Sequence, residues 1–137
     1  MQVKVEKLYA SAQLPVYGSA GAACFDLYAH NDRGDGVFGT GLAFEVPEGH
    51  VMLIYSRSGH GFKHGIRLAN CVGVIDSDYR GEVVVKLHHD RGGFLPLLCG
   101  ERIAQAMIVP VDRVTFVESD ELSGTERGAG GFGSTGK

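Results

Sequence analysis

The chain has 137 residues, of which 21 are glycine, about twice the share found in an average protein. Hydrophobic residues make up 44% and charged residues 21% of the sequence, which excludes an intrinsically disordered chain, and the glycines lack the period of collagen. The formal net charge of -3 provides no overall basic field for a nucleic-acid polymer. We therefore expect one globular domain whose glycines serve turns, loops or sites lined by backbone.

Short apolar runs separated by Gly, Pro and Asp predict many short strands. Within the segment 82–88, Val83, Val85 and Leu87 share one face, which predicts that these three side chains are buried. A helical turn or two within residues 58–64 is the one helix we expect. The pattern is typical of an all-β fold, either an antiparallel sandwich, a jelly roll or a closed barrel. The expected strands are residues 3–8, 24–29, 42–46, 51–55, 66–75, 82–88, 103–109 and 114–118.

Two glycine-rich segments interrupt this pattern. Residues 31–41 are polar and predict an exposed hairpin loop. Residues 123–137 partly match two nucleotide-binding motifs, but the G-x-G-x-x-G and Walker A motifs both need a following helix, which this sequence does not offer. The composition of this tail is that of a flexible end. Its backbone N–H groups, with Arg127 and the hydroxyls of Ser134 and Thr135, are also groups that bind anions.

The cysteine content points to a reducing environment. Cys24, Cys71 and Cys99 are odd in number and far apart, which argues against a disulfide framework and a structural zinc site. We therefore expect a cytoplasmic or other reducing intracellular location. No apolar run approaches the roughly 20 residues that span a bilayer, and no signal-peptide core follows Met1, so we expect no membrane partner.

Two strand ends carry side chains suited to a phosphorylated ligand, and each has a structural alternative. Residues 57–59 place a cation, a hydroxyl and a glycine after the run 51–55, which suits either a phosphate or a surface turn. Asp76 follows the run 71–75, where its carboxylate suits activation of a water, a hold on a sugar hydroxyl, or an Asx turn. Tyr79 suits an aromatic wall of a site or ordinary packing.

Polar side chains inside apolar strands need partners. Gln105 and Asp26 each cost free energy in such a strand unless they are hydrogen-bonded, and a structural role is the commoner one. Two pairs of histidines lack the acidic residue that follows the first histidine of an H-E-x-x-H zinc motif. We interpret all four as surface histidines: His60, His64, His88 and His89.

Five segments, taken in chain order, resemble the motifs of the trimeric deoxyuridine triphosphate nucleotidohydrolases, the dUTPases. Each motif alone is weak, but together they cover nearly the whole chain in the family's order and spacing. The segments are residues 22–27, 57–59, 70–82, 100–105 and 127–136.

The resemblance implies hydrolysis of dUTP to dUMP and pyrophosphate, which limits uracil entry into DNA and supplies dUMP for thymidylate synthesis. It implies an all-β subunit, a jelly roll or distorted β-barrel, in a homotrimer with active sites shared between chains. Two parts follow from it: a barrel domain over residues 1–122 and a mobile lid over residues 123–137. Mg²⁺ is the implied cofactor.

The resemblance also assigns roles to residues. Asp76 is expected to orient and deprotonate the water that attacks the α-phosphorus, and to bind the sugar 3'-hydroxyl. Gln105 is expected to hold the phosphates and to reach that water, and Asp26 to act on Mg²⁺ through coordinated waters. Tyr79 packs beneath the deoxyribose on this reading. The remaining expected substrate-binding residues are Asn70, Gly73, Val74, Ile75 and Val84 for uracil, Arg57, Ser58 and Gly59 for the phosphates, and Arg127, Phe132, Gly133, Ser134 and Thr135 in the lid.

The sequence departs from the family pattern at two positions. The family commonly has glycine at the position of Cys24 and proline at the position of Ser56, and both differences concern supporting backbone. A dCTP deaminase or bifunctional relative needs a glutamate in the strand after the hairpin, and residues 83–87 contain none. A nucleotide-responsive regulatory protein is the other alternative, and complete motifs argue against loss of catalysis.

Overall fold

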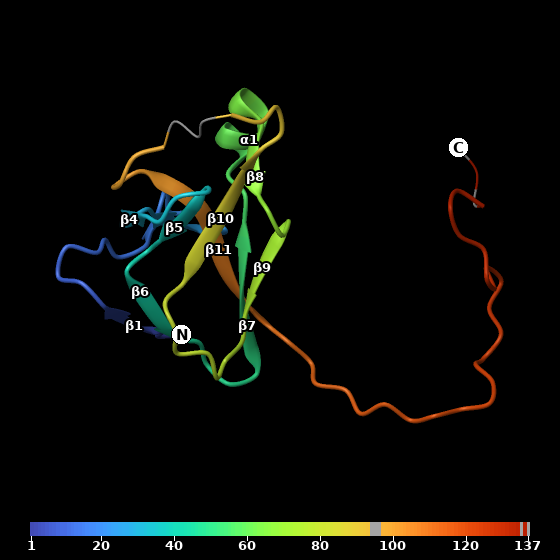
Figure 1. Ribbon diagram of the computed structural model, residues 1–137. Coiled ribbons are helices and arrows are strands. Elements are labelled where there is room, and N and C mark those ends of the chain that lie inside the picture. The colour runs from blue at the N-terminus through green and yellow to red at the C-terminus, as the bar shows by residue number, and fades with distance from the viewer. Residues whose placement is uncertain (94–96, 135, 137) are drawn as a thin grey trace.

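The computed structural model describes residues 1–93, 97–134 and 136 (Figure 1). Within these residues the chain is built of short strands and a single short helix, α1. The strands are β1 (Lys4–Lys7), β2 (Val16–Tyr17), β3 (Phe25–Tyr28), β4 (Asn31–Asp32), β5 (Val37–Gly39), β6 (Leu42–Glu45), β7 (His50–Tyr55), β8 (Ile66–Leu68), β9 (Val72–Ile75), β10 (Val84–His89) and β11 (Arg102–Pro110), and α1 spans Ser58–His64.

The strands form three antiparallel sheets. β1 pairs with β6, the second sheet has the order β4-β5-β10-β8, and the third has the order β2-β3-β11-β7-β9. The long strand β11 pairs with β3 on one side and β7 on the other, so it is the centre of the largest sheet. The predicted all-β fold is confirmed, and the arrangement is consistent with a jelly roll.

The hydrophobic core lies between the sheets because each strand turns one apolar face inward. Val83, Val85 and Leu87 are each 3% exposed or less, which confirms the alternation read from the sequence. Met52 and Ile103 are fully enclosed in the same core. Burying one such side chain contributes about 1.5–3 kcal/mol, so this shared core fixes the sheets that carry the polar strand ends.

The expected strand over residues 66–75 is two strands, and that prediction was wrong at its middle. β8 belongs to the four-stranded sheet and β9 to the five-stranded sheet. Between them the backbone of Cys71 adopts a left-handed conformation with φ of 65°, and Val72 N donates to the Asn70 carbonyl at 2.7 Å. The turn therefore moves the chain from one sheet to the next and leaves Asn70 at the junction.

Residues 31–41 do form a hairpin, but only its tip is exposed. β4 and β5 pair with each other, and β5 also pairs with β10. Phe38 and Thr40 are consequently buried, each at 1% exposure. The expectation of an exposed loop was wrong for this second half, because membership of the sheet outweighs glycine content.

Residues 114–118 are not a strand, contrary to the prediction. Val114, Phe116 and Val117 are 67%, 92% and 84% exposed, and the segment leaves the body after β11 with no neighbouring strand in the described part of the chain (Figure 1). A strand needs a partner for its backbone N–H and C=O groups. Residues 114–118 therefore have the apolar pattern of a strand but no neighbouring strand among the described residues.

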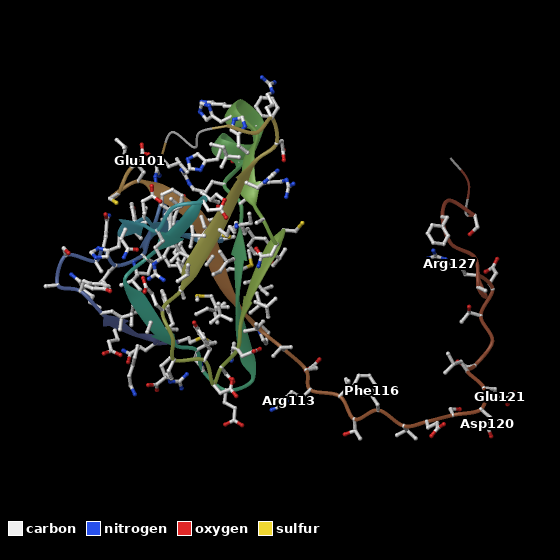
Figure 2. The ribbon with its side chains drawn as sticks, viewed as in Figure 1. Glu101, Arg113, Phe116, Asp120, Glu121 and Arg127 are labelled. Atoms are coloured by element: carbon white, nitrogen blue, oxygen red, sulfur yellow. The ribbon has the colours of Figure 1, made fainter. Side chains whose placement is uncertain are left out.

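The end of the chain lies far from the barrel. From Val111 onward the described residues form no helix or strand, with turns only near residues 126–134, and the orange-to-red segment in Figure 1 runs well away from the sheets. Figure 2 shows Arg127 on this segment, at a distance from every labelled residue of the body. In the described residues, no helix has the length and apolar character that a membrane crossing requires.

Candidate active site

A cavity of about 460 Å³ opens beside β9 and β10. Its lining includes all the residues expected to contact uracil. The turn after β8 supplies one of them, β9 supplies three, and β10 supplies the last, so segments far apart in sequence meet here. These residues are Asn70, Gly73, Val74, Ile75 and Val84.

β9 suits the recognition of a planar base because it is an edge strand. It pairs with β7 on one side only, so its other edge presents backbone donors and acceptors. Gly73 keeps β9 close to β7, since a Cβ at that position would come within 3.1 Å of Ile54 Cβ. A strand edge beside an apolar cavity can form hydrogen bonds to the polar edge of a base, while the two faces of the base contact side chains.

The turn after β9 positions Asp76 and Tyr79. Tyr79 N donates to the Asp76 carbonyl at 3.2 Å, so the main chain of Asp76 makes the turn bond and its side chain is exposed. Arg80 Nη1 donates to the carbonyls of Ser77 and Tyr79, at 2.7 and 2.9 Å. This bracing holds the Asp76 carboxylate at the end of the strand, where it can meet a ligand or a water.

The Tyr79 ring is fixed at both ends. Its hydroxyl donates to the Glu82 carbonyl at 3.0 Å. The ring also lies directly over Gly81, because a Cβ on Gly81 would overlap the Tyr79 ring and hydroxyl. A flat aromatic surface held in this way is a rigid floor for a ligand.

A second polar group forms at the far end of the five-stranded sheet. Asp26 in β3 lies opposite Gln105 in β11, and Gln105 lies opposite Tyr55 in β7. The chain leaves β7 at Tyr55, so Ser56 and Arg57 follow directly beside these polar residues. The pairing of β3, β11 and β7 therefore places these polar residues side by side, and no separate loop has to fold to bring them together.

Asp26 and Gln105 both have the partners that burial requires. Arg57 Nε lies 3.3 Å from Asp26 Oδ1, and Arg102 Nη1 lies 3.3 Å from Asp26 Oδ2. Gln105 Nε2 donates to the Ser56 carbonyl at 3.0 Å. We refer to Asp26, Arg57, Arg102 and Gln105 as the cationic cluster. It offers two guanidinium groups around one carboxylate, a set that suits a phosphate chain.

Ser56 has a structural role that its sequence position did not reveal. Its Oγ accepts a hydrogen bond from Leu68 N at 2.9 Å, while its carbonyl accepts from Gln105. Ser56 therefore links the end of β7 to the end of β8 across α1. Cys24, the other departure from the family pattern, is half-buried. Burial, and then the Asp26 carboxylate, raises the pKa of the Cys24 thiol above its ordinary value.

His60 is not a surface histidine, so the interpretation from sequence was wrong for this residue. It is half-buried, and its Nε2 lies 3.2 Å from Arg57 Nη1. The same Nη1 donates to the Arg102 carbonyl at 3.2 Å. Burial, followed by the charge of Arg57, lowers the pKa of His60.

Two of the other three histidines lie at the surface. His64 and His88 are exposed, as expected, and His89 is half-buried. Nδ1 of His89 accepts a hydrogen bond from Arg91 N at 3.3 Å. In the described part of the chain, no group of three or more His, Cys, Asp or Glu residues is arranged to hold a metal ion.

Asp76 and the cationic cluster lie at opposite ends of one sheet. β9 runs antiparallel to β7, with Val72 opposite Tyr55 and Ile75 opposite Met52. Asp76 therefore lies beyond the Met52 end of β7, whereas Arg57 follows the Tyr55 end. About five residues of strand, at about 3.3 Å each, separate the two ends by roughly 15–20 Å. A single chain does not bring Asp76 to the cluster.

The expected lid residues do not meet either group within one chain. Arg127 Nε donates to the Gly130 carbonyl at 2.8 Å, within the tail itself. Phe132 is fully exposed, and so are Gly133 and Ser134. Thr135 lies outside the described residues. Ser58 and Gly59, by contrast, begin α1 immediately after Arg57 and are exposed at the cluster.

Antiparallel sheets, a cavity beside an edge strand and a cationic cluster are features of a β-barrel protein suited to a phosphorylated base. Comparison with known protein families identifies the family. The family model for dUTPase matches residues 10–136, and the chain belongs to the dUTPase family. Hydrolysis of dUTP is the function of that family.

Individual relatives agree over the full length. The deoxyuridine 5'-triphosphate nucleotidohydrolase of Nautilia profundicola is 49% identical and is covered over 100% of both chains. The enzyme of the same name from Helicobacter hepaticus is 42% identical over 99% of this chain and 89% of its own. Among solved structures, the Staphylococcus bacteriophage 80alpha dUTPase with dUPNHPP superposes with a TM-score of 0.83, at 27% identity and 99% coverage of both chains.

The deaminase alternative finds no support in the hairpin. β10 contains no glutamate, and Glu82, which precedes it, is engaged elsewhere. Glu82 Oε1 accepts from Gly41 N at 2.8 Å, and Glu82 Oε2 forms an ion pair with Arg33. Its carboxylate therefore fastens the β4–β5 hairpin and does not project into the base cavity.

Proposed function

We propose that this chain hydrolyses dUTP to dUMP and pyrophosphate as a homotrimer whose active sites each combine residues of neighbouring subunits. The observation that carries this proposal is the separation of Asp76 from the cationic cluster along β7. A water at the Asp76 carboxylate must reach the α-phosphorus, while Arg57 must reach the same phosphate chain. Two copies side by side satisfy both requirements, and one copy does not.

The base cavity would select uracil and deoxyribose. The free edge of β9, with Asn70, would bind the polar edge of uracil, and the wall at Val84 would leave no room for the thymine methyl. Tyr79, held over Gly81, would pack beneath the deoxyribose and exclude a ribose 2'-hydroxyl. The wall at Val84 and the fixed Tyr79 ring would thus select uracil and deoxyribose without a conformational change in the barrel.

The cationic cluster would bind the phosphates. Arg57 presents a guanidinium that is already held on Asp26 and on the Arg102 carbonyl, and the Ser58 hydroxyl and the Gly59 backbone lie next to it. Gln105 is oriented by the Ser56 carbonyl, which leaves its amide oxygen to accept from a water. Such preorganised donors stabilise the charge that develops on a leaving pyrophosphate.

The residues present suit Mg²⁺ held through water. Both oxygens of Asp26 face arginine side chains, and the carboxylate is 14% exposed, so direct ligation would have to displace two cations. Mg²⁺ retains several of its waters and takes phosphate oxygens as ligands. Asp26 would accept hydrogen bonds from those waters. When bound, the ion would neutralise charge on the phosphate chain.

Asp76 would act as the general base. Its carboxylate would take a proton from water as the water oxygen bonds to the α-phosphorus. The bond between the α-phosphorus and the bridging oxygen breaks, and that electron pair leaves with pyrophosphate. The proton passes from Asp76 to solvent. Atoms and charge balance with dUMP, pyrophosphate and one proton as products.

The tail would close the site as a lid on a neighbouring copy, with a barrel domain over residues 1–122 and a lid over residues 123–137. Phe132 would stack on uracil, and Arg127 with Ser134 and Thr135 would bind the γ-phosphate. The apolar segment that leads to the lid supports this proposal, since Phe116 and Leu122 are 92% and 90% exposed. Side chains of this kind are normally buried against a partner.

The three free cysteines support a reducing intracellular compartment such as the cytoplasm. In that setting the reaction would limit uracil entry into DNA and supply dUMP for thymidylate synthesis.

The reaction is tested by pyrophosphate release from dUTP, dTTP, dCTP and UTP, each with Mg²⁺ and with a chelator. We expect rapid release from dUTP alone, and only with the ion. Equal rates on dUTP and UTP would contradict the Tyr79 sugar gate, and equal rates on dUTP and dTTP would contradict the methyl-excluding wall. Ammonia release from dCTP would revive the deaminase alternative.

A further inference from the structure

Arg57 is held by three groups, and one of them is not part of the family motifs described above. Its Nε pairs with Asp26, and its Nη1 donates to the Arg102 carbonyl. The third group is His60 on α1, whose Nε2 lies 3.2 Å from the same Nη1. A guanidinium only donates hydrogen bonds, so Nε2 of His60 must be the acceptor and the imidazole must be neutral, with its proton on Nδ1.

The surroundings of His60 favour this neutral form. Nδ1 is buried and has no hydrogen-bond partner among the described residues, so the contact with Arg57 is the polar contact that the ring makes there. Burial has the largest effect and lowers the pKa of His60. The charged groups facing the ring are Arg57, His64 and Arg102, which oppose protonation, and Glu101, which favours it (Figure 2 labels Glu101).

We infer that His60 is a positioning residue for phosphate binding: its neutral imidazole accepts a hydrogen bond from Arg57 and fixes the guanidinium at the cationic cluster. This inference rests on the proposed role of Arg57. Protonation of His60 would remove the acceptor and place a second cation beside the guanidinium. Arg57 would then lose one of its three anchors, and the affinity for the triphosphate would fall on acidification.

The direction of the pH effect follows from the ring's burial. A free histidine titrates near pH 6.5, and His60 titrates lower. The imidazole is therefore neutral and bonded at pH 7 and above, and the bond is lost as the pH falls through the lowered pKa. Triphosphates titrate in the same region, so the comparison must be made between variants at each pH.

Three variants distinguish the effect of the hydrogen-bond acceptor at residue 60 from the effect of protonating the imidazole. His60→Gln keeps an acceptor at about the position of Nε2 but does not titrate, and His60→Leu removes the acceptor. His64→Gln, on the exposed side of the same helix, is the matched control. The ligand is dUpNHpp, a non-hydrolysable analogue of dUTP. Its Kd is measured by calorimetry with Mg²⁺ from about pH 5 to about pH 8, alongside KM and kcat for dUTP.

We expect His60→Leu to raise Kd about 3- to 10-fold at neutral pH, the effect of losing one ordinary hydrogen bond, because Arg57 keeps its two other anchors. His60→Gln should match the unsubstituted protein at neutral pH and bind more tightly than it does at low pH. His64→Gln should follow the unsubstituted protein throughout. Identical pH profiles for the unsubstituted protein and His60→Gln would overturn the inference, and this comparison holds even if His60→Leu fails to fold.

A double-mutant cycle distinguishes this inference from the proposed function beneath it. If Arg57→Ala leaves the Kd of dUpNHpp unchanged, the proposed role of Arg57 is wrong. If Arg57→Ala weakens binding and His60→Leu does not, only the role of His60 is wrong. When both weaken binding, the double variant should be no weaker than Arg57→Ala, because His60 acts through Arg57. Additive effects would contradict the inference.

Discussion

At the scale of single residues, Asp26 organises the cationic end of the site. Each of its oxygens faces a different arginine, so one carboxylate both neutralises and orients two guanidinium groups. A half-buried ion pair of this kind is weak support for stability, since desolvation offsets the Coulomb attraction. Its value lies in preorganisation, because Arg57 and Arg102 do not have to be ordered when a phosphate arrives.

Asp76→Asn tests the assignment of the general base. Asparagine keeps the shape of the side chain but does not accept the proton, so kcat for dUTP should fall about 10²- to 10⁴-fold. The Kd of dUpNHpp should change little, because the asparagine amide can still accept from the sugar 3'-hydroxyl and the cavity and the cluster are unchanged. Asp78→Asn, two residues along the same turn, is the control and should retain turnover. Full activity of Asp76→Asn would remove Asp76 from the mechanism.

Gly81→Ala tests whether the Tyr79 ring is the sugar floor. The added methyl would meet the ring directly and tilt it out of place, so discrimination of dUTP from UTP should fall several-fold in the ratio of kcat/KM. Gly21→Ala, where a methyl meets nothing within 4 Å, should leave the ratio unchanged. An unchanged ratio in Gly81→Ala, with the altered ring position verified by a crystal structure, would contradict the gate.

At the scale of elements, a turn takes the chain from the four-stranded sheet to the five-stranded sheet. In the turn between β8 and β9, Cys71 adopts a left-handed backbone conformation, and the strand that follows, β9, is the edge of the five-stranded sheet. The open side of β9 then becomes a wall of the base cavity. The turn after β9 carries Asp76 and Tyr79, so β9 and this turn together carry the residues proposed as base wall, sugar floor and general base.

Deleting residues 123–137 tests the lid. The deleted residues touch no core side chain within the described structure, so the melting temperature should stay within about 2 °C. Turnover of dUTP should fall at least about tenfold, because the lid excludes water and adds contacts to the phosphates. Phe132→Ala should show part of this loss. Unfolding of the truncated chain would mean that the tail is structural.

Much of the fold is readable from alternation alone. The pattern of Val83, Val85 and Leu87 predicted the buried face of β10 correctly, and α1 lies where a short helix was expected. The break inside residues 66–75 was missed because the run stays apolar and contains no proline. The left-handed conformation falls on Cys71, a residue type that does not signal it. Segment 114–118 has a β pattern but no neighbouring strand among the residues that the structure describes.

The candidate site was predictable as far as motifs reach. The residues expected to contact uracil do line one cavity, whereas spacing along the chain could not show which cluster Asp76 joins. His60 was missed because a position on a helix does not tell which face meets a neighbouring arginine. Ser56 and Arg102 were missed as partners because their hydrogen bonds cross between strands, and register is set by the whole sheet.

At the scale of the whole molecule, a slightly acidic chain places two arginines at one end of a sheet and Asp76 beyond the other end. The net charge is -3, yet Arg57 and Arg102 lie together on Asp26. The apolar tail segment around Phe116 is exposed in one chain (Figure 2). Both features point to assembly, because neighbouring copies would complete the site and cover the segment.

Subunit complementation tests the shared site most directly. Asp76→Asn and Arg57→Ala are purified separately as proteins of little activity, and their trimeric state is checked by light scattering. They are then unfolded together, refolded as a 1:1 mixture, and assayed for pyrophosphate release from dUTP. If each site takes Asp76 from one chain and Arg57 from another, random trimers should recover roughly a quarter of the wild-type activity. A mixture no more active than the two variants assayed alone would show that one chain supplies both residues, and would contradict the shared site.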